Sequence, residues 1–302
     1  MKKTIVKSTV RTAKCELWID DKLVRSLLKE QFPELMYLPI NFFDSGLDNV
    51  VFRLGDQLSV RLPRRKEAAM IIENEQIWLP SIHSRLNIPV PIHYGFGKPT
   101  KDYPWRWSVL PWLDGVTASQ ELLSINQAKQ FASFLRLLHT SAPLHAPVNL
   151  APAVLLNQSV TFFEQRIKQL EIETKLITQN IKNTWYEALN IPVDTQPKWL
   201  HGDLHPGNVL VKNGAISGII DWGAISSGDI AIDLCSIWTL FLSPEARQQA
   251  LLEYGNISNA TLIRAKGRAI SYGLILLSIK LANSSKLATI GKKILRSISE
   301  DR

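Results

Sequence analysis

The feature that most constrains the fold is a pair of short apolar runs, NVLV at 208–211 and SGII at 217–220, with KNGAI between them. An Asn-Gly pair between β-prone runs is a strong signal for a two-residue hairpin turn, because such turns need residues that tolerate positive φ. We therefore expect the two runs to pair as antiparallel strands through Asn213 and Gly214. In such a hairpin, the residues just before the first strand and just after the second lie at the same end.

Three oxygen-bearing side chains are predicted to meet at that end of the hairpin. Asn208 stands at the start of the first run, Asp221 follows the second, and Asp203 lies in the loop LHGDLHPG, five residues before Asn208. Mg²⁺ prefers oxygen ligands, and it usually takes one or two from the protein while phosphates complete its shell. The pattern therefore indicates a site for a magnesium ion and phosphate groups.

The order of these residues also matches the parts of a phosphoryl-transfer site. In such sites a loop Asp accepts the proton of the acceptor hydroxyl, and an Asn five residues later and the Asp of a D-F-G segment hold the metal. HGDLHPGN supplies the first two parts, and DWG at 221–223 supplies the third with Trp as its large aromatic residue. We predict Asp203 as the catalytic residue, and Asn208 and Asp221 as metal ligands.

The rest of the sequence predicts an α+β fold with two lobes. Short β-prone segments occur at 37–43, 50–54, 58–62 and 106–110, and helical patterns occur among them at 20–31 and 66–79. Further helical patterns occur at 126–139, 158–172, 177–189 and across 230–297, interrupted by a β-like block at 199–221. We predict a β-rich N-terminal lobe over 1–110 and a mostly helical C-terminal lobe over 111–302.

Composition narrows the class of protein. A hydrophobic fraction of 45% and a charged fraction of 21% are typical of soluble globular chains. The net charge of +8 gathers at the two ends of the chain, with no central basic run interleaved with aromatics, so we expect no nucleic-acid partner. The N-terminus lacks a secretory pattern, and YGLILLSIKLA is too short to span a bilayer. Two distant cysteines, Cys15 and Cys235, suit a reducing compartment, so we predict a cytoplasmic protein with no membrane partner.

These motifs resemble those of the aminoglycoside phosphotransferase family, small-molecule kinases that share the bilobal protein-kinase-like fold. The resemblance rests on HGDLHPGNVLV and GIIDWGAISSGDIAIDL and extends over about residues 40–240. GLDNVVFRLG and VRLPRR are also similar to segments of macrolide phosphotransferases. The resemblance implies ATP or GTP as the phosphate donor, Mg²⁺ as the cofactor and a small-molecule hydroxyl as the acceptor.

The resemblance also implies roles for residues in the N-terminal lobe. FDSGLDNVVFRLG occupies the place of the loop that covers the nucleotide phosphates, and Ser45, Gly46 and Asn49 are its candidate contacts. Arg61 stands where the family usually has a phosphate-binding Lys. Arg remains a permanent cation and can hold a phosphate with two N–H groups, so this departure preserves phosphate binding.

Two further elements of this lobe are implied in the same way. Glu75 fits the place of the carboxylate that orients the cation, and Glu73 is the alternative. WSVLPWLDG fits the connection between the lobes, where the backbone of Leu110 and Trp112 would contact the base. The indole rings of this region are expected to pack rather than to recognise the nucleotide; they are those of Trp105, Trp107 and Trp112.

In the C-terminal lobe, the resemblance implies that Asp233 binds the backbone of the catalytic loop from the start of a helix. His201 is expected to hold that loop in place. For His205 two interpretations stay open, a surface residue or a residue near the substrate. Only twelve residues separate Asp221 from Asp233 and no A-P-E follows, which leaves no room for a peptide platform and favours a small-molecule acceptor.

The identity of the acceptor stays open at this point. An aminoglycoside or a macrolide would make the protein an antibiotic-resistance kinase, and a similar hydroxyl-bearing metabolite is equally compatible. One alternative is a metabolic kinase of the choline or fructosamine type. The other is a nucleotide-binding pseudokinase that acts as a regulator, which Arg61 and the thin glycine loop favour and which the intact Asp203, Asn208 and Asp221 argue against. The oligomeric state is also open.

Overall fold

The structure is a computed structural model that describes residues 17–46, 48–148, 160–278 and 285–301. The chain divides into two compact units: one comprises 1–76 and 92–112, and the other comprises 77–91 and 113–302. Cys15 and the first two residues of the helix predicted at 158–172 lie outside the described residues. Among the described residues, no helix combines the length and the apolar character needed to cross a bilayer.

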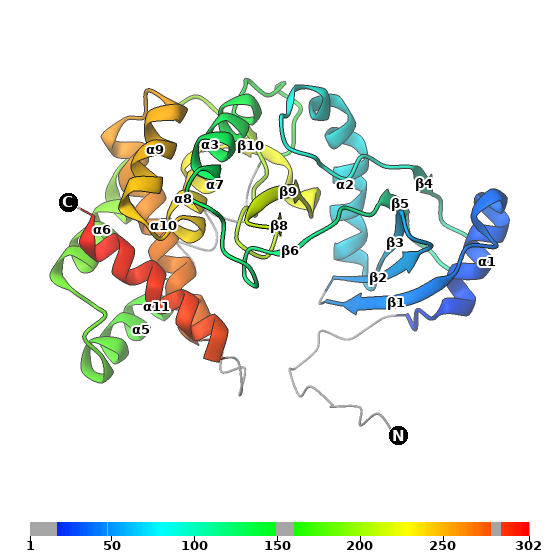
Figure 1. The fold of residues 1–302 in the computed structure, drawn as a ribbon, viewed down its shortest axis with the longest axis horizontal. Coiled ribbons are helices and arrows are strands. Elements are labelled where there is room, and N and C mark those ends of the chain that lie inside the picture. Colours follow the sequence, from blue (N-terminus) through cyan, green and yellow to red (C-terminus); the bar gives the residue numbers. More distant parts are fainter. Residues whose placement is uncertain (1–16, 47, 149–159, 279–284, 302) are drawn as a thin grey trace. The chain divides into compact units, whose positions relative to one another are not determined.

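The first unit is built on a five-stranded antiparallel sheet in the order β1-β2-β3-β5-β4 (Figure 1). Its strands are β1 (Ile40–Ser45), β2 (Asn49–Leu54), β3 (Leu58–Pro63), β4 (Gly95–Gly97) and β5 (Trp107–Pro111). Helix α1 (Asp21–Gln31) and a 3-10 turn (Pro33–Leu35) precede the sheet, and α2 (Lys66–Ile82) follows β3.

Helix α1 packs its apolar stripe on this sheet. Asp20 caps the helix by accepting a hydrogen bond from the Leu23 N–H at 2.9 Å, as its position before the first turn predicts. Val24, Leu27 and Leu28 are buried in one cluster with residues of β2, β3 and β5. The helix predicted at 20–31 is therefore confirmed, and its burial places the core of the unit between α1 and the sheet.

Two strands of this sheet differ from the sequence-based expectation. The first begins at Ile40 rather than at residue 37, because Leu35 and Leu38 are joined by a turn hydrogen bond of 3.1 Å. The short strand β4 had no β-prone signal, since it consists of Gly-Phe-Gly. A side chain at Gly97 would come within 2.0 Å of the Trp107 ring, so this strand needs glycine for close approach.

The second unit holds two small sheets and most of the helices. Strands β6 (Val116–Thr117), β8 (Val209–Lys212) and β9 (Ala215–Ile219) form one sheet, and β7 (Lys198–Leu200) pairs with β10 (Ser226–Gly228). The helices are α3 (Gln127–Leu138), α5 (Val160–Glu173), α6 (Gln179–Asn190), α7 (Ala231–Leu234), α8 (Ser236–Leu240), α9 (Pro244–Tyr254), α10 (Asn259–Ser278) and α11 (Ser285–Glu300). Short 3-10 turns lie at His83–Arg85 and Trp222–Ala224.

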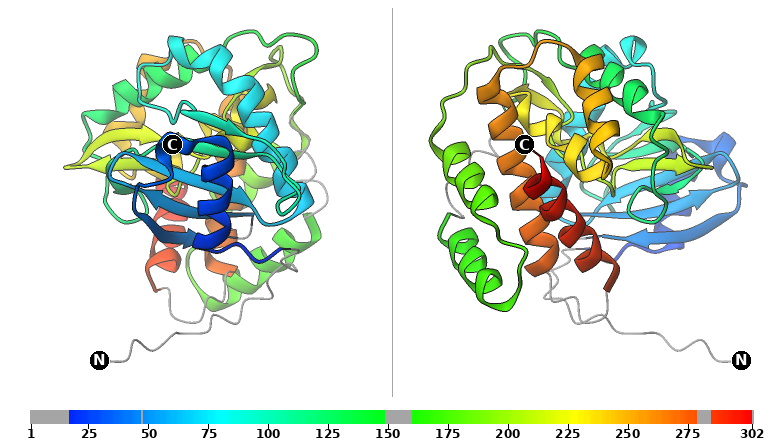
Figure 2. Two further views of the ribbon diagram at one scale, coloured as in Figure 1. Left: turned by 90° about the vertical axis from the view of Figure 1, so that its right-hand side faces the viewer. Right: turned by 60° about the vertical axis from the view of Figure 1, so that its left-hand side comes forward.

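Helix α10 is central to this unit. It packs against α5, α6, α7, α8 and α11, and Figure 2 shows α5 and α6 running alongside α10 and α11. The predicted stripe on α3 is buried as expected, at Phe131, Phe134, Leu135 and Leu138. The continuous helical pattern at 230–297 is divided among α7 to α11.

The boundary between the units is more complex than the single predicted cut at 110. Residues 77–91, which include the last turns of α2, belong to the second unit. Trp78 packs on Trp199 and on His145, with ring centroids 5.1 and 5.3 Å apart, and the Pro89 carbonyl accepts a hydrogen bond from the Ile219 N–H at 2.9 Å. These contacts join residues 77–91 to β7 and β9, and no local sequence pattern predicts them.

Candidate active site

A buried carboxylate fixes the start of the loop that joins β7 to β8. Asp233, at the start of α7, is fully buried, and its two oxygens accept the backbone N–H groups of His201 at 2.7 Å and Gly202 at 2.9 Å. The Oδ2 atom also lies 3.4 Å from Nε2 of His139. Hydrogen bonds to a buried carboxylate are strong, so the loop is held rigidly, and the contact expected of Asp233 is present.

His201 joins this loop to the strand that precedes Asp221. Its Nδ1 accepts the Asp203 N–H at 3.3 Å, so the proton is on Nε2, which donates to the Ile220 carbonyl at 3.0 Å. The ring also packs against Trp222, with centroids 4.7 Å apart. Both ring nitrogens are used by the backbone, so His201 positions the loop, as expected.

The predicted hairpin brings Asn208 and Asp221 to one end. Strands β8 and β9 pair with Val209 opposite Ile219, and the next residues are linked by a 2.9 Å bond from the Ile220 N–H to the Asn208 carbonyl. The turn residues Asn213 and Gly214 have φ values of 55° and 74°, as a two-residue hairpin turn requires. Asp221 itself has a φ of 62°, which turns the chain directly after the strand.

The environment of Asn208 suits an oxygen ligand for a metal. The residue is buried, and its Nδ2 donates to the Asp203 carbonyl at 2.9 Å, which leaves Oδ1 as the amide atom available to a cation. Among the described residues, no group of three or more His, Cys, Asp and Glu side chains could hold a metal ion. Asn208 and Asp221 would supply two oxygen ligands, and Mg²⁺ bound with nucleotide phosphates commonly takes that number from a protein.

Asp203 lies beside His205 at the mouth of this loop. The Asp203 side chain is 57% exposed, and its Oδ2 is 3.6 Å from the His205 Nε2 and 3.4 Å from the Asn208 Nδ2. Desolvation raises the pKa of Asp203, but the hydrogen bond from His205 and the neighbouring His201 and Asn208 outweigh it, so the pKa lies below its usual value. Asp203 is therefore ionised at neutral pH, the form that can accept a proton.

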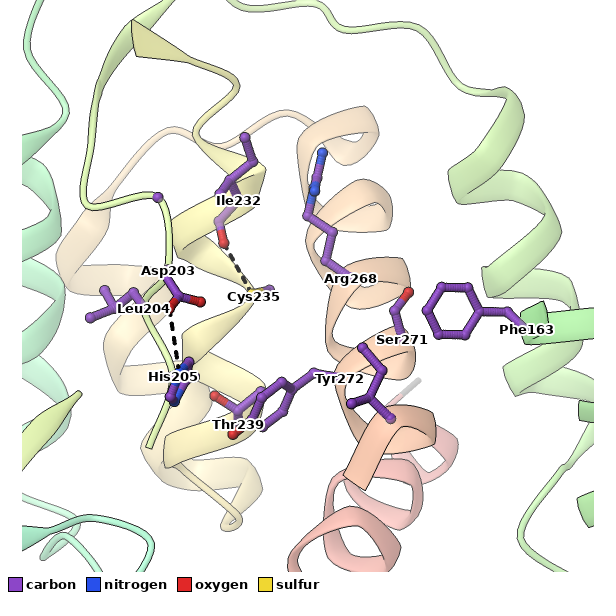
Figure 3. Close-up of a pocket in the computed structure, with 12 residues that line it drawn as sticks. Phe163, Asp203, Leu204, His205, Ile232, Cys235, Thr239, Arg268, Ser271 and Tyr272 are labelled. Atoms are coloured by element: carbon purple, nitrogen blue, oxygen red, sulfur yellow. Dashed lines mark hydrogen bonds and ion pairs between the residues drawn. The ribbon is translucent and has the colours of Figure 1, made fainter. Parts of the chain in front are cut away.

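His205 has a defined position that sequence analysis left open. Its Nδ1 accepts the Gly207 N–H at 3.0 Å, so Nε2 carries the proton and faces Asp203. The ring stacks on Tyr272 of α10, with centroids 5.5 Å apart and planes at 22° (Figure 3). The stacking partner is far away in the sequence, and nothing in the HGDLHPGN segment identifies it.

A pocket opens beside Asp203 (Figure 3). The catalytic loop forms one wall, Cys235 and Thr239 line another, and α5 and α10 complete it with Phe163, Arg268 and Tyr272. Sequence analysis gave no signal for these residues, because they are dispersed over α5, α8, α10 and the junction of α7 with α8 and carry no shared pattern.

In the first unit, Arg61 and Glu75 form a buried ion pair. Arg61 Nη2 of β3 and Glu75 Oε2 of α2 are 2.5 Å apart, and their side chains are 9% and 0% exposed. Glu73 instead is half exposed and lies 3.7 Å from Arg106. Of the two carboxylates considered from the sequence, the structure therefore pairs Glu75 with Arg61.

A histidine that sequence analysis did not single out completes this cluster. His93 Nε2 lies 3.4 Å from Glu75 Oε1, and the His93 side chain is fully buried. Burial, together with the nearby charge of Arg61, lowers the pKa of His93 to about 4. His93 is therefore neutral at pH 7, and the charges in the cluster are those of Arg61 and Glu75.

The loop between β1 and β2 is held by two arginines of VRLPRR. The Gly46 N–H donates to the Asn49 carbonyl at 3.0 Å, and Arg64 Nη1 donates to the Gly46 carbonyl at 2.8 Å. Arg65 forms an ion pair with Asp48. Asn49 Oδ1 is buried without a hydrogen-bond partner among the described residues. Ser45, Gly46 and Asn49 thus lie on one hairpin end, and their contact with phosphates stays a prediction.

The backbone of Trp112 is less available than the sequence suggested. Its N–H donates to the Gln57 carbonyl at 2.7 Å, which leaves the Trp112 carbonyl for a base, while Leu110 lies opposite Ser59 in the sheet. The Trp112 ring packs under Arg53, 4.1 Å from the guanidinium carbon. The packing role expected for the tryptophans holds, since Trp107 is fully buried and Trp105 packs on the same core.

Residues 39–267 match the sequence profile of the phosphotransferase enzyme family, APH. The chain belongs to this family. The matched region includes the ion pair of β3 and α2, the catalytic loop, the hairpin and most of α10.

Individual relatives are similar to parts or to the whole of the chain. A homoserine kinase of Gluconobacter oxydans is 28% identical over 156 residues, which are 49% of this chain and 48% of that protein, so the chain spans about half the length of this curated relative. The GDP complex of aminoglycoside 2'-phosphotransferase-IIIa has a TM-score of 0.63 at 17% identity, covering 92% of this chain and 98% of the other. The macrolide 2'-phosphotransferase of Brachybacterium faecium has a TM-score of 0.60 at 19% identity, covering 93% and 99%. At these identities the two structures establish the bilobal kinase-like fold.

Proposed function

We propose that the protein is a small-molecule kinase that transfers the γ-phosphate of ATP or GTP to a hydroxyl group. The observation that carries this proposal is the arrangement at one end of β8 and β9. Asp203 lies there beside Asn208 at the mouth of a pocket, and Asp221 follows the partner strand. The buried pair of Arg61 and Glu75 supports the same function, because a fixed guanidinium is suited to hold phosphate.

In the proposed reaction, the acceptor oxygen attacks the γ-phosphorus and the bond to the bridging oxygen of the β-phosphate breaks. The hydroxyl proton passes to the Asp203 carboxylate, and ADP or GDP leaves. Asn208 and Asp221 would hold Mg²⁺, whose charge offsets that of the phosphates when it is bound. Arg61, oriented by Glu75, would bind the nucleotide phosphates, with Ser45, Gly46 and Asn49 as further contacts.

Three acceptor classes follow from the comparisons and the fold: aminoglycosides, macrolides and smaller hydroxyl-bearing metabolites. The solved relatives favour the first two through their names, and the homoserine kinase favours the third. A nucleotide-binding regulator without transfer activity is the alternative, and it requires Asp203, Asn208 and Asp221 to serve no reaction. Cytoplasmic localisation and the absence of a nucleic-acid partner stay predictions.

A phosphate-transfer assay tests the proposal. Wild-type protein and Asp203→Asn are incubated with Mg-ATP or Mg-GTP and a panel of hydroxyl compounds, and the phosphorylated product is quantified. We expect transfer by the wild type and a loss of about a hundredfold or more in the variant, because the variant lacks the base. Nucleotide affinity, measured by calorimetry, should persist in Asp203→Asn. Turnover by Asp203→Asn near the wild-type rate would refute the assignment, and nucleotide binding without any transfer would favour the regulator.

A further inference from the structure

The acceptor pocket is lined by a cation that has no hydrogen-bond or ion-pair partner among the described residues. Arg268 of α10 lines the pocket together with Asp203, and Figure 3 shows the two side chains on different elements, α10 and the loop after β7. The guanidinium makes no hydrogen bond or ion pair with the described residues, and its Nε is buried without any partner. A buried polar atom without a hydrogen-bond partner is costly, so the Nε of Arg268 needs an explanation.

Arg264, one turn earlier in α10, differs from Arg268 because its guanidinium is engaged by carboxylates. Arg264 binds both oxygens of Asp229, at 2.8 and 3.2 Å, and it also binds Asp194 at 2.9 Å. The other nearby carboxylate, Asp233, accepts the backbone of the catalytic loop. The carboxylates of Asp194, Asp229 and Asp233 are therefore already engaged by other groups, and no hydrogen bond or ion pair joins Arg268 to an acid within the part of the chain that the structure describes.

Burial also disfavours the charged form of Arg268. Desolvation lowers the pKa of Arg268, and the interactions with Cys235, Asp229 and Asp233 offset this only in part. A bound oxyanion would restore the interactions that burial removes, because a guanidinium donates two parallel hydrogen bonds to a carboxylate or a phosphate.

The pocket is lined by one negatively charged side chain, Asp203, and by the positively charged Arg268. Among the residues that line it, Asp203 is the acidic side chain and Arg268 is the permanent cation, while His205 lies beside Asp203 and the remainder include Phe163, Ile232 and Ile275. A polycationic acceptor would find a single carboxylate there and would be repelled by Arg268. An acceptor with a hydroxyl and an oxyanion would place the first at Asp203 and the second at Arg268.

We propose that Arg268 binds a carboxylate or another oxyanion of the acceptor, so that the substrate is a small hydroxy acid rather than a polycationic antibiotic. This inference rests on the proposed kinase function, and it assigns the substrate class of the same pocket. The partial similarity to a homoserine kinase is consistent with it, since homoserine is a hydroxy amino acid.

The test is a kinetic comparison of matched acceptors. L-homoserine and its amide, glyceric acid and glycerol, and glucose 6-phosphate and glucose form three pairs that differ in the anionic group, and kanamycin and erythromycin represent the antibiotics. We expect the best acceptor to carry an oxyanion. Arg268→Met should lower kcat/KM for that acceptor by about tenfold or more, because charged hydrogen bonds are lost.

Two further variants separate binding from folding. Arg268→Lys keeps the charge and should recover part of the lost kcat/KM, chiefly through KM, even if Arg268→Met is poorly folded. Lys293→Met removes one exposed positive charge of α11 and is the matched control, expected to change kcat/KM by less than about twofold. The pair with the larger difference in kcat/KM identifies the anion. A difference within the homoserine or glyceric acid pair indicates a carboxylate, and a difference within the glucose pair indicates a phosphate.

Other results would contradict either the role of Arg268 or the kinase proposal itself. A best acceptor without an anionic group, a panel in which no anionic member accepts phosphate, or equal losses in Arg268→Met and Lys293→Met would overturn the assignment of Arg268. The first and third results leave the kinase proposal intact. If no compound of any class is phosphorylated and Asp203→Asn turns over nucleotide as the wild type does, the kinase proposal fails and this inference fails with it.

Discussion

Variants of the ion pair between Arg61 and Glu75 should change the free energy of unfolding and the affinity for nucleotide independently. At the observed 2.5 Å, and with an effective dielectric constant of about 20, the Coulomb attraction is about 7 kcal/mol. The desolvation of two buried ions costs a similar amount, so the intact pair adds little net stability. Removing one partner is different, because the other charge is then left buried at a cost of about 3–5 kcal/mol.

We therefore expect Glu75→Ala to lower the free energy of unfolding by about 3–5 kcal/mol, measured by urea titration followed by circular dichroism. The double variant Arg61→Met with Glu75→Leu replaces both ions by apolar side chains and should recover most of that loss. It should nevertheless bind Mg-ATP at least about tenfold more weakly in calorimetry, since the cation that we propose to bind phosphate is gone.

The control for this experiment is Glu73→Ala, because Glu73 is half exposed and forms only a long contact with Arg106. We expect its effect to stay below about 1 kcal/mol. A loss of less than about 1 kcal/mol in Glu75→Ala, or a double variant as unstable as the single one, would refute the reasoning about buried charge.

Three further predictions concern single side chains. Asp233→Asn replaces the carboxylate that accepts two backbone N–H groups by an amide. We expect the free energy of unfolding to fall by about 2–4 kcal/mol and turnover to fall with it. An unchanged urea midpoint would contradict this prediction. His93 has a pKa of about 4, against 6.5 when unfolded, so the unfolded chain alone gains a proton between pH 7.5 and 5.5. Acidification over that range should cost the wild type about 1.3 kcal/mol that His93→Gln does not lose, and equal pH dependence in the two proteins would argue against it. Burial raises the pKa of Cys235 to about 12, so in a Cys15→Ser background the native thiol should react with a disulfide reagent at pH 8 at least about a hundredfold more slowly than in urea.

Local sequence signals predicted the part of the site that is itself local. The Asn213-Gly214 turn pairs β8 with β9, and the pairing places Asn208 and Asp221 at one end, although an irregularity at Ser217 shifts the register by one residue. The same holds for the amphipathic stripe of α3 and the cap of α1. In each case the residues that determine the geometry are neighbours in the chain.

Contacts between distant segments could not be predicted in this way. Nothing near His205 indicates that its ring stacks on Tyr272, and nothing near Arg268 indicates that it faces the same pocket. His93 carries no motif, and its burial beside Glu75 follows from the packing of the first unit. The engaged N–H of Trp112 depends on Gln57, which lies in the turn between β2 and β3.

The hairpin of β8 and β9 also has a consequence for folding. All residues from the catalytic loop to the DWG segment lie within 201–223, so closing their contacts costs little loop entropy. The acceptor pocket, in contrast, needs α5 and α10, which approach the loop from distant parts of the chain. Contacts of short sequence separation form faster than long-range ones. We expect the end of the hairpin that carries Asn208 and Asp221 to be structured early in refolding, and the pocket beside Asp203 to be completed last.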